Sequence, residues 1–538
     1  MASDSGGLLL STEFHSDAKT TDTSIICRFN GINYTVHISD GALRFHSLPG
    51  YTGPLKEQEI FLRNILSAKL VGKNQSRRPL FSPRDFFSRR TGVYDASAAT
   101  PELQLCVAKR VGEQKWRLKT VVLDFESAEF GERICADIGQ FIEGLRSRPK
   151  RLMFFINPIS GGGQALRLMT RRIIPHLKAA AMPFDYIVTT HSGHAREWIL
   201  EQPDIGKAFD GLIAVGGDGI FNEILDGVIH RAQDEKITSK SDLSSPTVRV
   251  GIIPAGSTDS IGCCIGLGDP VSALIHILLG DHMKLDVGAV FRVQDGSLIK
   301  FFCAFLGYGF FSDTLRNSEK HWLRRYLGKT RYMLAGAKTF FLNRAYPGYI
   351  SYRPAAEAGP DGYPDEGLTC RQNCPVCSEV GEKKSSTSAF SFSGTSDEEQ
   401  EWQTLDGRFT NVIAVSLCCK SEKSPKGLAP TSHCGDGCLD LLFVKKLGYF
   451  RLLNYLISTS RGIGPRSVLG ENLHACRAYE LVFRSKKPPL DGQLDTLRSH
   501  PQNPRPSGTV MRNCARTDIH VKIYCQLIDI FGSGLESS

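Results

Sequence analysis

The sequence predicts a mixed α/β protein with additional β-rich parts, in three domains at residues 1–147, 148–290 and 291–538. Three observations predict this division. The first part contains runs of alternating apolar and polar residues that are joined by turn residues. Apolar strands that alternate with helices begin near Arg151, and a second strand-rich part begins near Asp286. The chain has 538 residues, which suits about three domains of common size.

The N-terminal domain is predicted to consist of β-strands followed by one helix. Asn30-Gly31 separates two alternating runs and supplies the positive φ angles of a tight hairpin turn. Leu103–Lys109 and Trp116–Phe125 flank a second turn in the same way. Apolar residues then follow at helical spacing, namely Ile134, Ile138, Phe141, Ile142 and Leu145.

Residues 77–90 of this domain interleave arginines with phenylalanines. The pattern suits an anionic lipid surface, and it suits a solvated loop equally well. The net charge of +9, from 65 Lys and Arg against 56 Asp and Glu, agrees with an anionic ligand or membrane surface. We expect no nucleic acid partner.

The composition of the chain, with 41% hydrophobic and 22% charged residues, excludes a mostly disordered or fibrous protein. The 16 cysteines are spread along a chain without a signal-peptide core or an apolar run of about 18 residues. We therefore expect reduced thiols, an intracellular location and only peripheral membrane contact. Residues 354–401 and 488–506 are predicted to be flexible insertions because they are rich in loop-forming residues.

The middle domain is predicted to be a parallel sheet with crossover helices. Apolar strands at residues 151–156, 184–190, 212–215 and 249–253 alternate with helical stretches such as Ala165–Lys178. Three later runs predict a further, antiparallel layer, at residues 411–417, 439–444 and 519–530.

Three glycine-containing loops follow strands of the predicted parallel sheet. In open α/β sheets, ligands bind outside the carboxyl ends of the strands, and glycine lets backbone N–H groups close around an anion. One such loop alone is a weak signal, and three in register are a stronger one. The loops are Asn157-Pro158-Ile159-Ser160-Gly161-Gly162-Gly163, Gly216-Gly217-Asp218-Gly219, and Pro254-Ala255-Gly256-Ser257-Thr258-Asp259.

Asp218 is a carboxylate among loops that suit phosphate. It is either a turn-forming residue or a general base that takes a proton from a hydroxyl about to attack a phosphoryl group. Glu223 follows on the first turn of the next predicted helix, where carboxylates are common in any case.

Together, the three loops resemble the diacylglycerol-kinase-like catalytic domain. Three further features are similar to ceramide kinases within the sphingoid lipid kinases: Leu306–Asp313, the segment from Ser318 to Tyr332, and Cys370-x₃-Cys374-x₂-Cys377. The N-terminal strands and helix resemble a pleckstrin-homology domain. The resemblance implies such a domain at residues 1–147, a three-layer α/β domain at 148–290 and an antiparallel β-sandwich at 291–538.

The resemblance also implies an activity: transfer of the γ-phosphate of ATP to the primary hydroxyl of ceramide, with Mg²⁺. It makes Asp218 the catalytic base, places Gly216, Gly217 and Gly219 around the reacting groups, and assigns Asp313 to the sphingoid head group. The implied nucleotide-binding residues are Asn157, Pro158, Ile159, Gly161, Gly162, Gly163, Thr189, Thr190, His191, Ser192, Gly193, Glu223, Gly256, Ser257, Thr258, Arg325 and Arg331.

Three departures from the family pattern keep alternatives open. Gly162 stands where the family has a Lys, and either Arg324 or Arg325 could be the arginine that binds the nucleotide phosphates. The family's Asp-Gly-Glu turn before the last strand is absent, and Asp491-Gly492-Gln493 is the segment nearest in type. A weakly active or inactive lipid-binding protein is therefore one alternative. A kinase that acts on sphingosine or diacylglycerol is another.

The cysteine spacing and the family resemblance also bear on a possible zinc site and on the partners of the protein. Cys370, Cys374 and Cys377 are either zinc ligands, with Cys418, Cys419, His433 or Cys434 as the fourth, or reduced thiols. Ceramide is the expected substrate, and anionic membrane lipids are expected to bind the N-terminal domain. Whether calmodulin is a partner is left open. The expected location is the cytoplasm, peripherally at the Golgi or plasma membrane.

Overall fold

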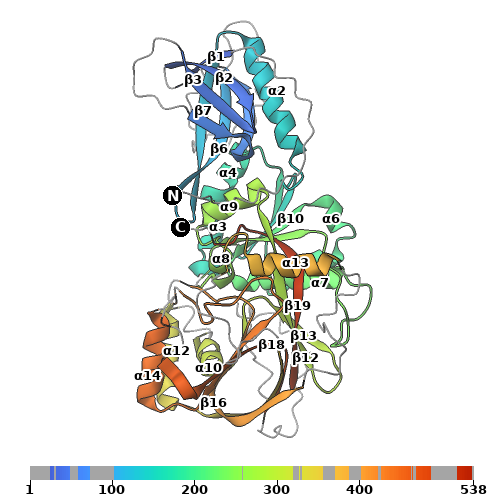
Figure 1. The fold of residues 1–538 in the computed structure, drawn as a ribbon, viewed down its shortest axis with the longest axis vertical. Helices are drawn as coiled ribbons and strands as arrows, with labels where there is room; N and C mark the ends of the chain where they lie inside the picture. The colour runs from blue at the N-terminus through green and yellow to red at the C-terminus, as the bar shows by residue number, and fades with distance from the viewer. Residues whose placement is uncertain are drawn as a thin grey trace, which may run out of the picture.

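The computed structural model describes residues 25–29, 32–48, 58–72, 102–256, 258–318, 326–327, 330–355, 370–386, 401–421, 424, 426–461, 463, 468–485 and 518–535. Figure 1 shows an elongated arrangement, with the N-terminal sheet at one end, the parallel strands in the middle and the later strands at the other end. The structure is therefore a mixed α/β fold, as predicted.

The N-terminal part is an antiparallel seven-stranded sheet in the order β4-β3-β2-β1-β7-β6-β5, followed by α2. The predicted second hairpin is confirmed, because β6 and β7 pair along their length and Gln114 takes a positive φ of 52° in the turn. The Ser127 hydroxyl accepts from the Glu129 N–H and caps α2. The elements are β1 (Ile25–Phe29), β2 (Ile32–Ser39), β3 (Ala42–Ser47), β4 (Gln58–Phe61), β5 (Ile65–Val71), β6 (Glu102–Gly112), β7 (Lys115–Phe125) and α2 (Ala128–Gly144).

Side chains of α2 close one face of this sheet, with Ile134 and Ile138 buried in its apolar cluster. The strands and the C-terminal helix agree with the predicted pattern, and the likeness to a pleckstrin-homology domain stays a prediction. The arginine- and phenylalanine-rich residues 77–90 and the Asn30-Gly31 turn lie outside the described residues.

The middle part is a parallel sheet in the order β11-β10-β8-β9, as the alternating pattern predicted. Alternate strand side chains pack on α5 and α7 on one face and on α3, α4 and α9 on the other. The elements are β8 (Leu152–Ile156), α3 (Gln164–Leu168), a π-helical turn (Met169–Ile173), α4 (Ile174–Ala179), β9 (Phe184–Val188), α5 (His194–Glu201), α6 (Ile205–Ala208), β10 (Gly211–Gly216), α7 (Asp218–Arg231), β11 (Arg249–Pro254), α8 (Ser260–Cys264) and α9 (Pro270–Leu279).

The C-terminal part is antiparallel and shares its sheet with the middle part. β19 pairs with β12 and β18 antiparallel and meets β11 in parallel at Val250 and Ile530, so the strands join into one twelve-stranded sheet. The predicted sandwich stays a prediction. The strands are β12 (His282–Arg292), β13 (Leu298–Phe302), β14 (Phe305–Gly309), β15 (Tyr346–Pro354), β16 (Gln403–Val415), β17 (Leu439–Lys445), β18 (Leu473–Ser485) and β19 (Ile519–Phe531).

Four helices accompany these strands: α10 (Phe310–Ser318), α12 (Arg331–Leu342), α13 (Pro375–Ser386) and α14 (Tyr449–Ser460). Among the described residues, no helix is both long and apolar enough to cross a bilayer. Helix α13 lies inside the stretch 354–401, so this predicted insertion is not uniformly irregular. The second one, 488–506, lies outside the described residues.

Candidate functional site

The three predicted glycine loops share one edge of the parallel sheet. Gly216 pairs with Pro254 at the carboxyl ends of β10 and β11. The Asn157 N–H donates to the Val215 carbonyl over 3.1 Å, and the Ala255 N–H donates to the Gly216 carbonyl over 2.9 Å. The three loops therefore lie at the edge where ligands of such sheets bind.

The first loop is a run of glycines in the left-handed region. Gly161, Gly162 and Gly163 have φ angles of 59°, 73° and 88°. The turn before them is closed by the Ile159 N–H, which donates to Asn157 Oδ1 over 3.2 Å. Successive N–H groups in turns of this kind form concave sites for anions.

The loops approach each other so closely that glycine is required at two positions. A β-carbon on Gly161 would lie 2.5 Å from the Ala255 carbonyl oxygen, and one on Gly256 would lie 2.6 Å from the Gly217 α-carbon. By contrast, a β-carbon on Gly162 would meet no atom of the described chain within 4 Å. Gly162, which stands where the family has a Lys, therefore faces open space.

The predicted turn 189–193 follows β9 beside the first loop. The Thr189 N–H and hydroxyl both donate to the Ile156 carbonyl, over 2.9 and 3.2 Å. The Ser192 hydroxyl donates to Glu223 Oε1 over 3.4 Å and so links the turn to α7. Burial raises the pKa of Glu223 above its ordinary value, while hydrogen bonds and nearby Lys300 lower it.

Asp218 begins α7 and reaches the first turn of α8. Its Oδ2 accepts from the Ser260 N–H over 3.2 Å, and its Oδ1 accepts from the Ile261 N–H over 3.0 Å. Burial raises the pKa of Asp218, and the two amide bonds oppose that rise. Both oxygens keep a further lone pair, so the carboxylate is oriented and still able to accept a proton.

Asp313 lies on α10 and is held by three side chains. Arg316 donates to Oδ1 over 2.6 Å, the Tyr346 hydroxyl donates to Oδ2 over 2.6 Å, and the Arg344 guanidinium lies 3.7 Å away. Burial, together with this carboxylate, raises the pKa of the Tyr346 phenol. The sequence did not reveal Tyr346 and Arg344 as partners, because they follow more than thirty residues later, on and next to β15.

The pair Cys419–Lys420 lies between the segments of Asp218 and Asp313. The Lys420 N–H, next to Cys419, donates to Cys264 Sγ over 3.3 Å at the end of α8, whose first amides hold Asp218. Cys419 also belongs to an apolar cluster that packs against Phe311, two residues before Asp313. The C-terminal part therefore contacts the edge of the sheet that carries the glycine loops.

The predicted arginines are only partly described. Arg331 begins α12, is buried, and lies with its guanidinium 4.4 Å from the centre of the Tyr332 ring, while its Nη2 donates to the Tyr332 hydroxyl over 2.7 Å. Arg325 and Ser257 lie outside the described residues. Contact of these residues with a nucleotide stays a prediction.

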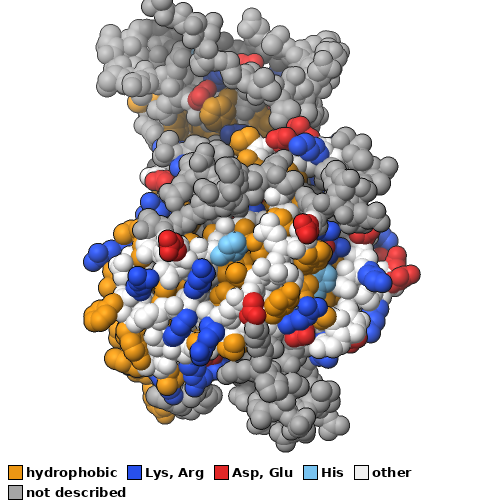
Figure 2. Space-filling view, turned by 60° about the horizontal axis from the view of Figure 1, so that its bottom comes forward, with side chains coloured by type: hydrophobic (Ala, Val, Ile, Leu, Met, Phe, Trp, Pro, Cys, Tyr) orange, Lys and Arg blue, Asp and Glu red, His pale blue; other side chains and the backbone are white. Residues whose placement is uncertain are grey.

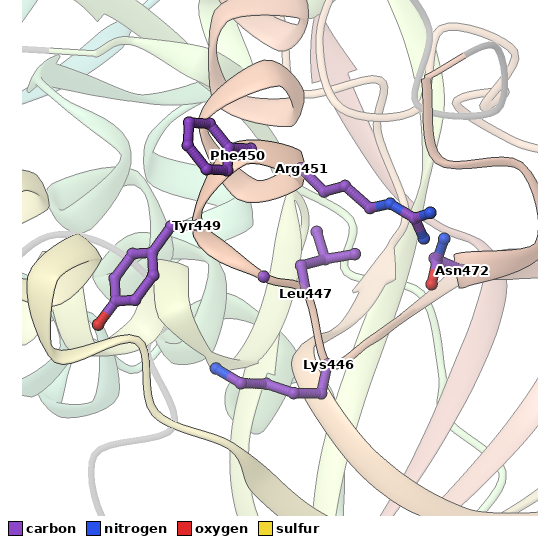
Figure 3. A pocket seen from close by; sticks show the side chains of 7 residues that line it. Lys446, Leu447, Tyr449, Phe450, Arg451 and Asn472 are labelled. Atoms are coloured by element: carbon purple, nitrogen blue, oxygen red, sulfur yellow. The ribbon is translucent and has the colours of Figure 1, made fainter.

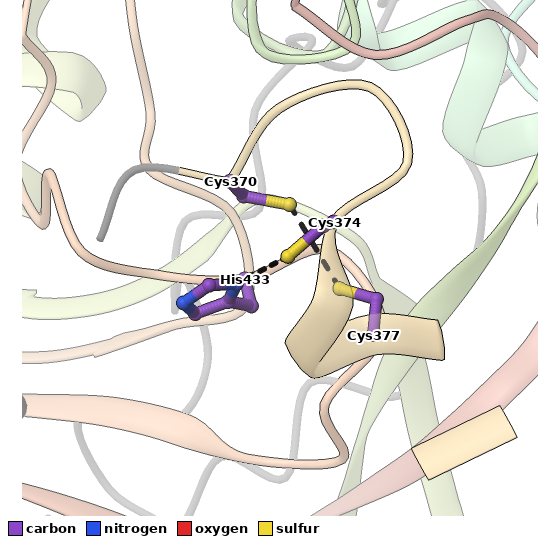
Figure 4. A group of neighbouring side chains, drawn as sticks. All are labelled: Cys370, Cys374, Cys377 and His433. Atoms are coloured by element: carbon purple, nitrogen blue, oxygen red, sulfur yellow. Dashed lines mark hydrogen bonds between the residues drawn. The ribbon is translucent and has the colours of Figure 1, made fainter. Parts of the chain in front are cut away.

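The three predicted cysteines converge with one of the four proposed fourth ligands (Figure 4). Cys370, Cys374, Cys377 and His433 present ligand atoms that all lie within 4.8 Å of one another. Cys374 Sγ lies 3.1 Å from His433 Nδ1, and Cys370 Sγ lies 3.8 Å from Cys377 Sγ. Such a donor set can hold a metal ion.

Comparisons with known proteins place these features in context. The model of the diacylglycerol kinase catalytic domain matches residues 151–290. The ceramide kinase of Homo sapiens is 31% identical over 458 residues, covering 80% of this chain and 82% of the relative. The ceramide kinase of Mus musculus is 32% identical over 456 residues, covering 80% and 83%. A crystal structure titled as a putative diacylglycerol kinase from Bacillus anthracis str. Sterne covers 72% of this chain and 97% of its own, at 17% identity and a TM-score of 0.45.

Proposed function

Because the chain belongs to the ceramide kinase family, we propose that it transfers the γ-phosphate of ATP to the primary hydroxyl of ceramide and forms ceramide 1-phosphate. The observation that carries the proposal is the placement of Asp218 beside three touching glycine loops at one sheet edge. Such loops suit phosphate groups, and a carboxylate beside them suits proton removal from the attacking hydroxyl.

In the proposed complex, the nucleotide lies along the glycine loops. Its phosphates lie against the backbone of residues 161–163 and Gly256, and the turn 189–193 contacts it from the neighbouring strand. The close contacts at Gly161 and Gly256 support this arrangement, because they show that the loops form one continuous surface.

The divalent ion of the proposed reaction fits the donors that the site offers. Glu223 is a partly buried carboxylate beside the turn 189–193, and burial raises its pKa, which a bound cation would lower. Glu223 and the nucleotide phosphates would hold Mg²⁺, which neutralises phosphate charge when bound. The proposal also includes Zn²⁺ at Cys370, Cys374 and Cys377.

Asp218 is the proposed general base. Its two amide partners hold it in one orientation, and its raised pKa makes it a stronger proton acceptor than an ordinary aspartate. Asp313 is the proposed partner of the ceramide head group, because its carboxylate is oriented by Arg316 and Tyr346 and keeps acceptor capacity for an amide N–H or hydroxyl.

Membrane association is part of the proposal. We assign binding of anionic lipids to the domain of residues 1–147, and a cytoplasmic location with peripheral contact at the Golgi or plasma membrane. The assignment rests on the predicted resemblance to a pleckstrin-homology domain, with which the antiparallel sheet and the helix α2 agree.

A second candidate function is ceramide binding with little catalysis. Gly162 favours it, because this position lacks the family's Lys and its surroundings are open. Purified protein with ³²P-labelled ATP and ceramide micelles separates the two functions. Labelled ceramide 1-phosphate is expected. Ceramide binding without transfer, at any tested Mg²⁺ concentration, supports the second candidate.

A further inference from the structure

We propose that Cys370, Cys374, Cys377 and His433 form a structural Zn²⁺ site that fastens the segment 370–386 to the protein core. We also infer that the zinc site helps to position Asp218, and this part rests on the proposed kinase function. The sequence left four candidates for the fourth ligand, and the geometry selects His433.

The spacing of two of the thiols matches a tetrahedral site. With Zn–S bonds of about 2.3 Å, two thiolates on a tetrahedron lie about 3.8 Å apart. Cys370 Sγ and Cys377 Sγ are 3.8 Å apart, well beyond the length of about 2.05 Å of a disulfide bond. Figure 4 shows the three sulfur atoms and the imidazole converging from α13, the segment before it and a separate loop.

Buried hydrogen bonds hold both ligand segments in place. Gln526 Nε2 donates to the Cys377 carbonyl over 2.8 Å and to the Gly435 carbonyl over 2.9 Å, and so bridges α13 and the loop of His433. The Asp286 N–H donates to the Cys434 carbonyl over 2.8 Å. These bonds fix the backbone of the two segments that carry the ligands relative to each other.

The site and the segment of Asp218 share one core cluster, which contains Cys370, Cys374, Cys418 and Cys264. Within it, Cys418 Sγ lies 3.3 Å from Cys264 Sγ. Cys264 ends α8, whose first amides hold the Asp218 carboxylate. Loss of the metal should therefore loosen α8 and shift the pH dependence of turnover.

Metal analysis of the purified full chain tests the site independently of activity. One zinc per chain is expected, and the Co²⁺-substituted protein should show the absorption of tetrahedral thiolate-bound cobalt. His433→Ala and Cys374→Ser should each remove the metal. Cys438→Ser, a matched thiol change in the same loop outside the tetrad, should keep it.

The outcomes separate this inference from the proposed function. Folded wild type without zinc, or full zinc content in His433→Ala, overturns the site. A zinc-loaded but inactive enzyme leaves the site standing and counts against the kinase. An unchanged acid limb of the pH profile in folded, zinc-free His433→Ala overturns the coupling to Asp218.

We also infer, from independent observations, that α12 and α14 form a surface that docks on an anionic phospholipid bilayer. The two helices lie side by side, because the Tyr449 hydroxyl donates to the Phe341 carbonyl over 3.0 Å and the Asn343 side chain donates to the Leu447 carbonyl over 3.1 Å. Figure 1 shows them together at one corner of the C-terminal part.

This surface exposes large apolar side chains from both helices. Phe450 is 91% exposed and Phe341 is 73% exposed. Figure 2 shows hydrophobic side chains gathered with Lys and Arg on the side where Figure 1 places α12 and α14. Further exposed apolar residues of the two helices are Met333, Leu334, Leu342, Tyr449, Leu453 and Ile457.

The sequence charge of the two helices and their flanks favours a bilayer over other partners. Residues 326–346 and 443–463 contain eight Lys and Arg, of which Arg331 is buried, and no Asp or Glu. At the start of α14, a shallow pocket combines Lys446 and Arg451 with Tyr449 and Phe450 (Figure 3). Apolar side chains flanked by cations match the acyl region and the phosphates of an anionic leaflet.

Vesicle sedimentation of the full chain tests this surface. The double variant Phe341→Ser/Phe450→Ser should bind phosphatidylcholine–phosphatidylserine vesicles at least about tenfold more weakly, since each lost phenylalanine contributes burial energy. Turnover on ceramide in detergent micelles should be retained. Tyr186→Ser, which removes an exposed aromatic residue on β9, is the control and should bind as wild type does.

Equal vesicle binding by the double variant and wild type overturns the inference. Self-association of the wild type that the double variant loses also overturns it, because the surface would then be a contact between two copies.

Discussion

Replacing Asp218 with Asn removes the proposed base while keeping the size of the side chain. Loss of a general base is expected to lower turnover by about 10²–10⁴-fold. The carboxylate also accepts from two amides, of Ser260 and Ile261. The single oxygen of Asn can replace one of these bonds, so the fold loses one charged hydrogen bond of about 1.5–3 kcal/mol.

The two effects can be separated by measurement. Turnover on ceramide, ATP affinity and thermal unfolding are measured for Asp218→Asn and for Asp259→Asn. The Asp259 carboxylate also accepts a loop amide, from Gly256, but carries no chemistry in the account. We expect both variants to bind ATP and unfold slightly earlier, and only Asp218→Asn to lose turnover. Full turnover in Asp218→Asn, or an equal loss in Asp259→Asn, refutes the assignment of the base.

Four further expectations follow from the same site. Asp313→Asn should raise the KM for ceramide while ATP affinity is unchanged; a change confined to ATP would contradict the assignment. Gly161→Ala should weaken ATP binding by about tenfold or more, because its β-carbon would meet the Ala255 carbonyl. Gly162→Ala has the same backbone strain but open space around it, so it should lose less ATP affinity. Equal losses of ATP affinity would contradict a shared loop surface. Because burial raises the pKa of Asp218, turnover should fall as the pH decreases and this base is protonated, and the fall should lie above the ordinary aspartate pKa of about 4. A fall in turnover at or below that pH argues against Asp218 as the base. Removal of divalent ions with EDTA should abolish transfer and added Mg²⁺ should restore it; transfer that persists in EDTA contradicts the role of the metal.

The strand pattern of the sheets could be predicted because it depends on local signals. Alternation and turn residues predicted the β6–β7 hairpin, and buried apolar runs predicted β8, β10 and β11. The position of the loops also followed, because parallel strands bring their carboxyl ends to one edge. The pairing of β19 with both halves could not be predicted, since register between distant strands depends on packing over the whole chain.

The partners of the site residues are non-local in the same way. The amides that hold Asp218 belong to α8, a helix of five residues that is too short for periodicity to reveal. The cysteine spacing left both a zinc site and reduced thiols open, and it offered four candidates for a fourth ligand. His433 is identified only by the fold, which brings its loop against α13 through Gln526.

The central claim is that this chain phosphorylates ceramide, and competition between acceptors tests it most directly. Purified wild-type protein is given ATP, Mg²⁺ and mixed micelles that contain equal amounts of ceramide, sphingosine and diacylglycerol, and the phosphorylated products are quantified by mass spectrometry. The account predicts that ceramide 1-phosphate dominates and that Asp218→Asn abolishes it. Preferential phosphorylation of sphingosine or diacylglycerol, or no product from a folded enzyme that binds ATP and ceramide, would contradict it.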